Sequence, residues 1–300
     1  MRNASALSRF VAPMIAVGVV LGGCGQPSAS PAPDAGSSAG SSAAGQPATS
    51  ARVPAGGPGM PVAAASGAKT QLNAEVDPAD LPAGSIYRNP ANSRSEVIVA
   101  DIRHTAVLIG DSQSEPSFGW PRQGLAAMGY HVFFCGLGGT GYVASNGKTG
   151  NYIDALQRGD WKLPYGAPPL VVIEGGGNDA ARGATDAQIV ANAERLIASI
   201  QERYPAAQVV MIGTLARGAS YGGGRRTQVD ALLGTVALKH GLPFVSVGDW
   251  LTKYELTNSM ADGVHLNAQG HKALGVILGK RLRAMGLEAK EPASISDLSR

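Results

Sequence analysis

Cysteine is scarce in this sequence, and neither sign of charge is in marked excess. Its 300 residues include only two cysteines, Cys24 and Cys135, which excludes a disulfide-stapled framework. The formal net charge is +3 and no basic stripe occurs, so we expect no nucleic-acid partner. No group of cysteines and histidines has the spacing of a zinc site, and we expect neither a metal nor another cofactor.

The first 24 residues have the pattern of an export signal. Arg2 and Arg9 lead into the apolar run 11–21, which is too short to span a bilayer. The following letters LGGC resemble the processing box of bacterial lipoproteins, which implies a lipidated N-terminal Cys24. We therefore expect an exported protein anchored by lipid to the outer face of the bacterial cell membrane. A secreted protein with an ordinary signal peptide is the alternative.

Residues 25–80 consist mainly of alanine, glycine, serine and proline. They contain almost no large apolar side chain, so burial cannot offset the entropy lost on ordering them. A flexible coil of about 50 residues spans roughly 40 Å on average. The segment is therefore predicted to be a disordered tether.

Residues 81–287 have the pattern of one α/β domain, which leaves 288–300 as a C-terminal tail. Strands are predicted at 105–110, 131–135, 170–175, 208–213 and 243–247, and helices at 121–129, 186–203, 226–241 and 267–285. Continuously apolar strands separated by helices indicate a parallel sheet with right-handed crossovers. Ligands of such sheets bind at the carboxyl ends of the strands, so chemistry is expected in the loops there.

These loops carry the groups that serine acyl transfer requires. That reaction needs a nucleophile, a base within about 2.6–3.2 Å, a group that orients the base, and donors for an oxyanion. Ser112 follows the first strand and can be the nucleophile, and His265 can be the base. Asp262, three residues earlier, can fix the histidine tautomer. The Ser112 N–H, a glycine N–H after the second strand and the Asn178 amide can form the oxyanion hole.

This set of motifs resembles the SGNH (GDSL-type) serine hydrolase family. G-D-S after the first strand, glycines after the second, G-x-N-D after the third and D-x-x-H near the C-terminus occur in the family's order. The resemblance implies a flavodoxin-like three-layer α/β/α sandwich with a five-stranded parallel sheet. It also implies a catalytic triad of Ser112, His265 and Asp262, and an oxyanion hole of Ser112, Gly139 and Asn178.

Two details of the resemblance stay open. Gln113 stands where the family often has leucine, which leaves the packing beside the nucleophile undetermined. Gly141 is the second choice for the oxyanion glycine, because the sequence alone does not separate it from Gly139.

Two other motifs suggest different chemistry. The letters GLGGTG at 136–141 match the G-x-G-x-x-G spacing of a dinucleotide-binding turn, but Gly147 and Gly150 interrupt the helix that such a turn requires. Ser220 lies in a G-x-S-x-G motif, but about seven residues after its strand, too far for a nucleophile elbow.

Three arginines flank the loop around Ser220. They are Arg217, Arg225 and Arg226, and either a solvated surface or affinity for an anionic substrate accounts for them. His271, one turn into the last predicted helix, is expected on the helix surface.

The sequence therefore predicts a monomeric serine hydrolase that cleaves O-acyl esters of small molecules or of the cell envelope. An O-acyltransferase that acts on a cell-envelope carbohydrate is the nearest alternative. A catalytically inactive binding module of the same fold is a further one.

Overall fold

The computed structural model describes residues 76–290, and a parallel sheet lies at their centre. Its strands are β3 (Thr105–Gly110), β4 (His131–Gly136), β5 (Leu170–Glu174), β6 (Gln208–Ile212) and β7 (Phe244–Val245). The five strands run parallel in the order β4-β3-β5-β6-β7. The order reverses beside β3, which places a topological switch point at its carboxyl end.

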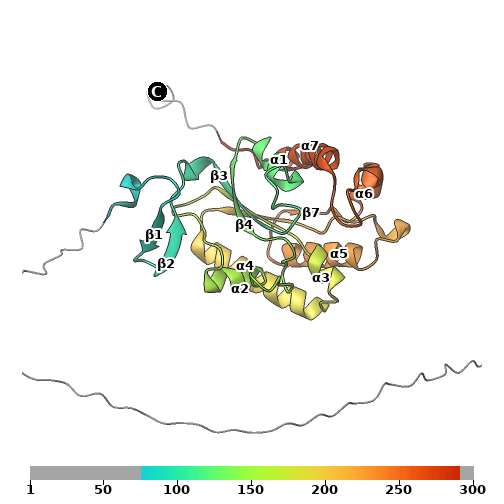
Figure 1. The fold of residues 1–300 in the computed structure, drawn as a ribbon, viewed down its shortest axis with the longest axis horizontal. Helices are drawn as coiled ribbons and strands as arrows, with labels where there is room; N and C mark the ends of the chain where they lie inside the picture. The colour runs from blue at the N-terminus through green and yellow to red at the C-terminus, as the bar shows by residue number, and fades with distance from the viewer. Residues whose placement is uncertain (1–75, 291–300) are drawn as a thin grey trace, which may run out of the picture. The chain divides into compact units, whose positions relative to one another are not determined.

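Helices cover both faces of this sheet and form the outer two layers (Figure 1). One face carries α1 (Trp120–Ala126), α6 (Trp250–Lys253) and α7 (Ala268–Ala284). The other carries α2 (Tyr152–Arg158), α3 (Gly177–Ala181), α4 (Asp186–Arg203) and α5 (Gly224–Lys239). The predicted α/β sandwich with a five-stranded parallel sheet is confirmed.

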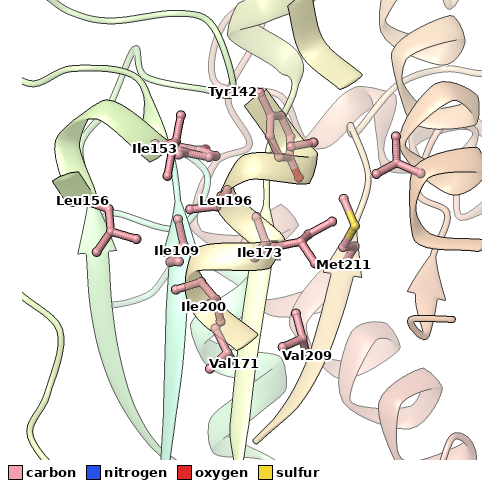
Figure 2. Close-up of a cluster of buried hydrophobic side chains, with 14 of the residues drawn as sticks. Ile109, Tyr142, Ile153, Leu156, Val171, Ile173, Leu196, Ile200, Val209 and Met211 are labelled. Carbon is pink, nitrogen blue, oxygen red and sulfur yellow. The ribbon is translucent and has the colours of Figure 1, made fainter. Parts of the chain in front are cut away.

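The central strands β3, β5 and β6 are apolar between their end residues because both of their faces are buried. In β5, Val171 and Ile173 pack in the cluster that includes α4, whereas Leu170 and Val172 pack in the cluster that includes α1 and α7. Figure 2 shows Val171 and Ile173 together with Leu196 of α4. Each fully buried aliphatic side chain contributes about 1.5–3 kcal/mol, so the sheet is a rigid base for the loops at its edge.

The long predicted helices are present with nearly the predicted bounds. Thr185 is the N-cap of α4, and its side chain forms a capping box with Gln188. The Asn267 side chain caps α7 by accepting a hydrogen bond from the Gly270 N–H. The predicted strand 243–247 is shorter in the structure, where only Phe244–Val245 pair with β6. Short 3-10 helices occur at Pro78–Asp80, Ile102–His104, Ala219–Tyr221 and Leu256–Ser259.

Sequence analysis missed the antiparallel hairpin of β1 (Ile86–Asn89) and β2 (Arg94–Val97), and the short helices α2, α3 and α6. Signals for α2 were present. Asn151 caps its first turn by accepting the Asp154 N–H, and Gly159 ends it in the left-handed region. Helix α3 has only five residues and begins with a glycine, so its sequence shows almost no helical periodicity.

The predicted signal peptide, its lipidation site Cys24, residues 25–75 of the predicted tether and residues 291–300 of the predicted tail lie outside the described residues. Within residues 76–290, none of the helices combines the length and hydropathy required to cross a bilayer.

Candidate active site

Ser112 lies in a tight turn at the carboxyl end of β3. The Ser114 N–H donates to the Asp111 carbonyl at 3.0 Å, and the Gln113 N–H donates to Asp111 Oδ1 at 2.9 Å. Gly110 must lack a side chain here, because a methyl group on it would lie 2.6 Å from Ser114 Oγ. The turn thus presents Ser112 half-buried at the edge of the sheet.

His265 and Asp262 approach Ser112 from the loop before α7. Ser112 Oγ lies 2.9 Å from His265 Nε2, and His265 Nδ1 lies 2.9 Å from Asp262 Oδ2. The other Asp262 oxygen accepts the Val264 and His265 N–H groups at 2.6 and 2.7 Å, which fixes the loop. The hydrogen bond with the His265 ring, assisted by these two N–H groups, holds the pKa of the Asp262 carboxyl well below its usual value. The three side chains that the sequence selected therefore lie in one hydrogen-bonded row.

Gln113 joins the serine turn to the histidine loop. Its side chain is buried, its Nε2 donates to the Val264 carbonyl at 3.0 Å, and its Oε1 accepts from Trp120 Nε1 at 3.2 Å. Gln113 therefore packs beside the nucleophile through polar contacts, whereas a leucine at this position would make only apolar contacts.

The glycines after β4 differ in what their N–H groups bind. The Gly138 N–H donates to Glu115 Oε2 at 2.7 Å, and the Gly141 N–H donates to the Ala144 carbonyl at 2.9 Å. The Gly139 and Ser112 N–H groups have no acceptor among residues 76–290. Gly139 has a φ of +78°, a conformation that glycine adopts readily. Of the two glycines proposed from the sequence, only Gly139 has a free N–H.

Asn178 lies in the first turn of α3, directly after β5. Its Nδ2 donates to the Thr140 carbonyl at 2.9 Å and to Asp111 Oδ2 at 3.1 Å. Because a carbonyl can only accept, the amide orientation follows from the contact with Thr140. The longer bond to Asp111 is the one that a ligand oxygen can replace most readily.

Buried carboxyl groups support these loops. Asp179 accepts three backbone N–H groups, from Tyr142, Val143 and Ala144, at 2.7–2.9 Å. Asp111 contacts Gln113 as described, and burial raises the pKa of its carboxyl to about 6. Both aspartates therefore hold the loops that carry the site.

Glu174 is a supporting residue that sequence analysis missed. It ends β5, is 2% exposed, and its Oε2 accepts a hydrogen bond from Ser114 Oγ at 2.6 Å. Burial, followed by the nearby Asp111 carboxyl, raises its pKa well above the usual value. A glutamate at the end of an otherwise apolar strand was the available signal.

The surface position predicted for His271 is wrong. The residue is 2% exposed, and its Nδ1 accepts the Trp120 N–H at 3.1 Å. Trp120 begins α1, whose N-cap Gly119 provides no side chain for this donor, so His271 takes the role of a cap. Burial, followed by the nearby His265, lowers the pKa of His271.

Neither competing motif forms the site that it suggested. Ser220 lies exposed in the short 3-10 helix Ala219–Tyr221, while His265 contacts Ser112. The helix after GLGGTG begins only at Tyr152, so Gly141 does not lead into a helix N-terminus. Gly141 is required for another reason, because a methyl group on it would lie 2.5 Å from Asp179 Oδ2.

A cavity opens beside Ser112, and Asn178, Leu215, Arg226 and Val264 contribute to its walls. It lies at the carboxyl edge of the sheet, where the topology predicted a ligand site. Among residues 76–290, no three histidine, cysteine or acidic side chains lie close enough to hold a metal ion.

The chain is similar in fold to several solved structures. No curated protein matches the chain. A family two carbohydrate esterase from Cellvibrio japonicus is 16% identical, with a TM-score of 0.49 over 64% of this chain and 64% of that chain. An active-site mutant of the Clostridium thermocellum family two carbohydrate esterase is 13% identical, with a TM-score of 0.48 over 64% and 68%. The lipase/acylhydrolase from Enterococcus faecalis is 23% identical, with a TM-score of 0.47 over 63% of this chain and 100% of that chain.

The family match covers most of the folded domain. Residues 106–273 match the model of the GDSL-like lipase/acylhydrolase family, which is more than half of the chain. The matched residues run from β3 into α7 and include the loops that carry Ser112, Asn178 and His265. The chain belongs to the GDSL-like lipase/acylhydrolase family and is an esterase.

Proposed function

We propose that the protein hydrolyses O-acyl esters with Ser112 as nucleophile, His265 as base and Asp262 as the group that orients the base. The observation that carries this proposal is the continuous row of contacts from Ser112 Oγ to His265 Nε2 and from His265 Nδ1 to Asp262 Oδ2, each 2.9 Å long. Both distances lie within the range over which a positioned base can take a proton.

In the first step, Ser112 Oγ attacks the ester carbonyl carbon while His265 Nε2 takes the hydroxyl proton. The carbon–oxygen bond to the alcohol then breaks, and His265 returns the proton to the leaving oxygen. Asp262 keeps Nδ1 protonated and stabilises the imidazolium that forms in between. The products of this step are the free alcohol and an acyl group on Ser112.

The tetrahedral intermediate needs donors for its negative oxygen. The free N–H groups of Ser112 and Gly139 support a role as two of them. Asn178 supplies the third when the oxyanion replaces Asp111 Oδ2 as the acceptor of one Nδ2–H bond. Each such donor is worth about 10²–10³ in rate, because it acts on charge that develops only in the transition state.

Water completes the cycle by attacking the acyl carbon on Ser112 while His265 takes its proton. The bond from that carbon to Ser112 Oγ then breaks, His265 returns the proton to Oγ, and the carboxylic acid leaves. If a sugar hydroxyl replaces the water, the same machinery transfers the acyl group. Ser112 and His265 are both present and in contact, which favours a catalyst over an inactive binding module of the same fold.

A panel of 4-nitrophenyl esters of increasing acyl length, assayed with and without a sugar acceptor, tests this proposal. We expect release of nitrophenol in the absence of any acceptor, and none with the Ser112→Ala variant. Turnover that depends on the sugar would assign a transferase. Failure to hydrolyse any ester would contradict the proposal.

We also propose that a lipid on Cys24 anchors the exported enzyme to the outer face of the bacterial cell membrane. The support is the sequence alone, in which an apolar run leads into LGGC. Two or more acyl chains hold a protein firmly on a bilayer. The Cys24→Ser variant should leave the membrane fraction, and wild-type protein that is fully soluble after export would contradict the anchor.

A further inference from the structure

A cationic side chain faces the cavity beside Ser112. Arg226 lies in the first turn of α5 and lines the same cavity as Ser112 and Asn178. Its guanidinium lies against the backbone of Gly177, where a methyl group would come within 3.1 Å of Nη1. Arg226 therefore reaches from α5 to the residue that precedes Asn178.

The neighbouring arginine shows a different environment. Arg225 forms an ion pair with Asp186 at 2.6 Å and donates to the Ala184 carbonyl at 2.8 Å. Arg226 makes no hydrogen bond or ion pair with any residue of the described chain. The charge of Arg225 is therefore paired with Asp186, whereas the N–H donors of Arg226 remain available at the cavity.

The carboxyl groups at the cavity are engaged elsewhere. Asp111 accepts from the Gln113 N–H and from Asn178 Nδ2, and Glu174 accepts from Ser114 Oγ. Neither forms an ion pair with Arg226 within residues 76–290, although the Arg226 charge opposes the rise that burial causes in the pKa of Asp111. A guanidinium with free donors fits a carboxylate in a bidentate arrangement.

We propose that Arg226 determines substrate specificity by binding a carboxylate that the ester substrate carries close to its scissile bond. This inference rests on the proposed function, because the cavity that Arg226 lines is the one at Ser112. The carboxylate belongs either to the acyl group or to the alcohol, and the two positions are separable by experiment.

The test uses the purified full chain and four esters that form two pairs, each with an anionic and a neutral member. 4-Nitrophenyl hemisuccinate carries its charge on the acyl group, and the acetate ester of 4-hydroxybenzoate carries it on the alcohol. The ratio of kcat/KM between each anionic ester and its neutral counterpart is measured for wild type, Arg226→Gln, Arg226→Lys and Arg225→Gln. The neutral counterparts are 4-nitrophenyl butyrate for the acyl pair and phenyl acetate for the alcohol pair.

We expect Arg226→Gln to lower this ratio by about 10- to 100-fold for one anionic ester, mainly through KM, as befits the loss of a charged hydrogen bond. Arg226→Lys should retain part of the ratio, and Arg225→Gln should match wild type. A ratio that Arg226→Gln leaves unchanged for both anionic esters would overturn the inference. So would an equal loss for neutral and anionic esters, which would mean that Arg226 only compensates Asp111. If wild type hydrolyses none of the esters, the proposed function fails first and the inference fails with it.

Discussion

Replacement of Gln113 by leucine, the residue that often follows the serine in this family, should weaken both the fold and catalysis. Gln113 is 5% exposed, and its two hydrogen bonds connect the Ser112 turn with the Val264 carbonyl and with Trp120 Nε1. Leucine removes both bonds. Trp120 is fully buried, so its indole N–H would be left without an acceptor.

The size of the stability effect follows from these contacts. An unsatisfied buried donor costs about 1–3 kcal/mol, and the lost bond to Val264 costs about 1 kcal/mol more. The additional apolar surface that leucine buries recovers about 1 kcal/mol of this sum. The net loss of about 1–3 kcal/mol corresponds to a drop of about 3–10 °C in melting temperature for a domain of this size.

The kinetic effect follows from the position of Val264. It directly precedes His265, whose side chain is 39% exposed. Without this connection, the imidazole samples more positions, and small displacements at a reacting centre are costly. We expect kcat to fall by about tenfold with KM changed by less than about twofold, because the main role of the bond is to orient the base.

Rate assays with a 4-nitrophenyl ester measure the change in kcat, and thermal melts on the same preparations measure the change in stability. Trp120→Phe is the matched control, since it removes the indole donor but keeps the bond from Gln113 to the Val264 carbonyl. It should lower stability with a smaller loss of kcat per folded molecule. A Gln113→Leu variant with wild-type kcat would refute the role of this bond in holding His265.

Substitutions at three further positions address the site. Asn178→Ala should lower kcat by about 10²–10³ with KM little changed, and Asn178→Asp should be at least as damaging because a carboxylate repels an oxyanion; a defect that tracks the folded fraction would assign Asn178 a structural role only. Asp262→Asn keeps an acceptor for the loop amides but faces His265 Nδ1 with an N–H, so kcat should fall by about 10²–10⁴; wild-type rates would exclude Asp262 from catalysis. Burial raises the pKa of Glu174, so its stabilising protonated form is lost as pH rises through that pKa. Glu174→Gln should therefore match wild type near pH 4 and melt about 2–4 °C higher at pH 8, and melting curves that stay parallel across this range would contradict the prediction.

The layers of the fold could be predicted because a strand that is buried on both faces has a continuously apolar sequence. After their first residues, the runs TAVLIG and QVVMI contain no polar side chain because α-helices cover both sides. Once the strands were assigned as parallel, their carboxyl ends had to meet at one edge, which brought Ser112 and Asn178 together without any knowledge of their contacts. The β1–β2 hairpin carries exposed charged residues and packs through few apolar side chains, so it leaves a much weaker pattern.

The details of the site depend on tertiary contacts that local sequence does not record. Gln113 and Val264 are separated by 151 residues, and no local rule links a glutamine amide to a carbonyl at that distance along the chain. His271 lies on a helix with mixed polar and apolar neighbours, so its burial follows from where α1 begins and not from its own surroundings in sequence. The choice between Gly139 and Gly141 likewise required the acceptor of each N–H.

Covalent labelling with a fluorophosphonate tests the central claim most directly, because the reagent traps an activated serine as a phosphonylated adduct. The full chain is treated with the probe, digested and analysed by mass spectrometry, alongside the Ser112→Ala and Ser220→Ala variants. The adduct should lie on Ser112, should persist in Ser220→Ala and should be absent from Ser112→Ala. An adduct on Ser220, undiminished labelling of Ser112→Ala, or no labelling of wild type would contradict the assignment of Ser112 as the nucleophile.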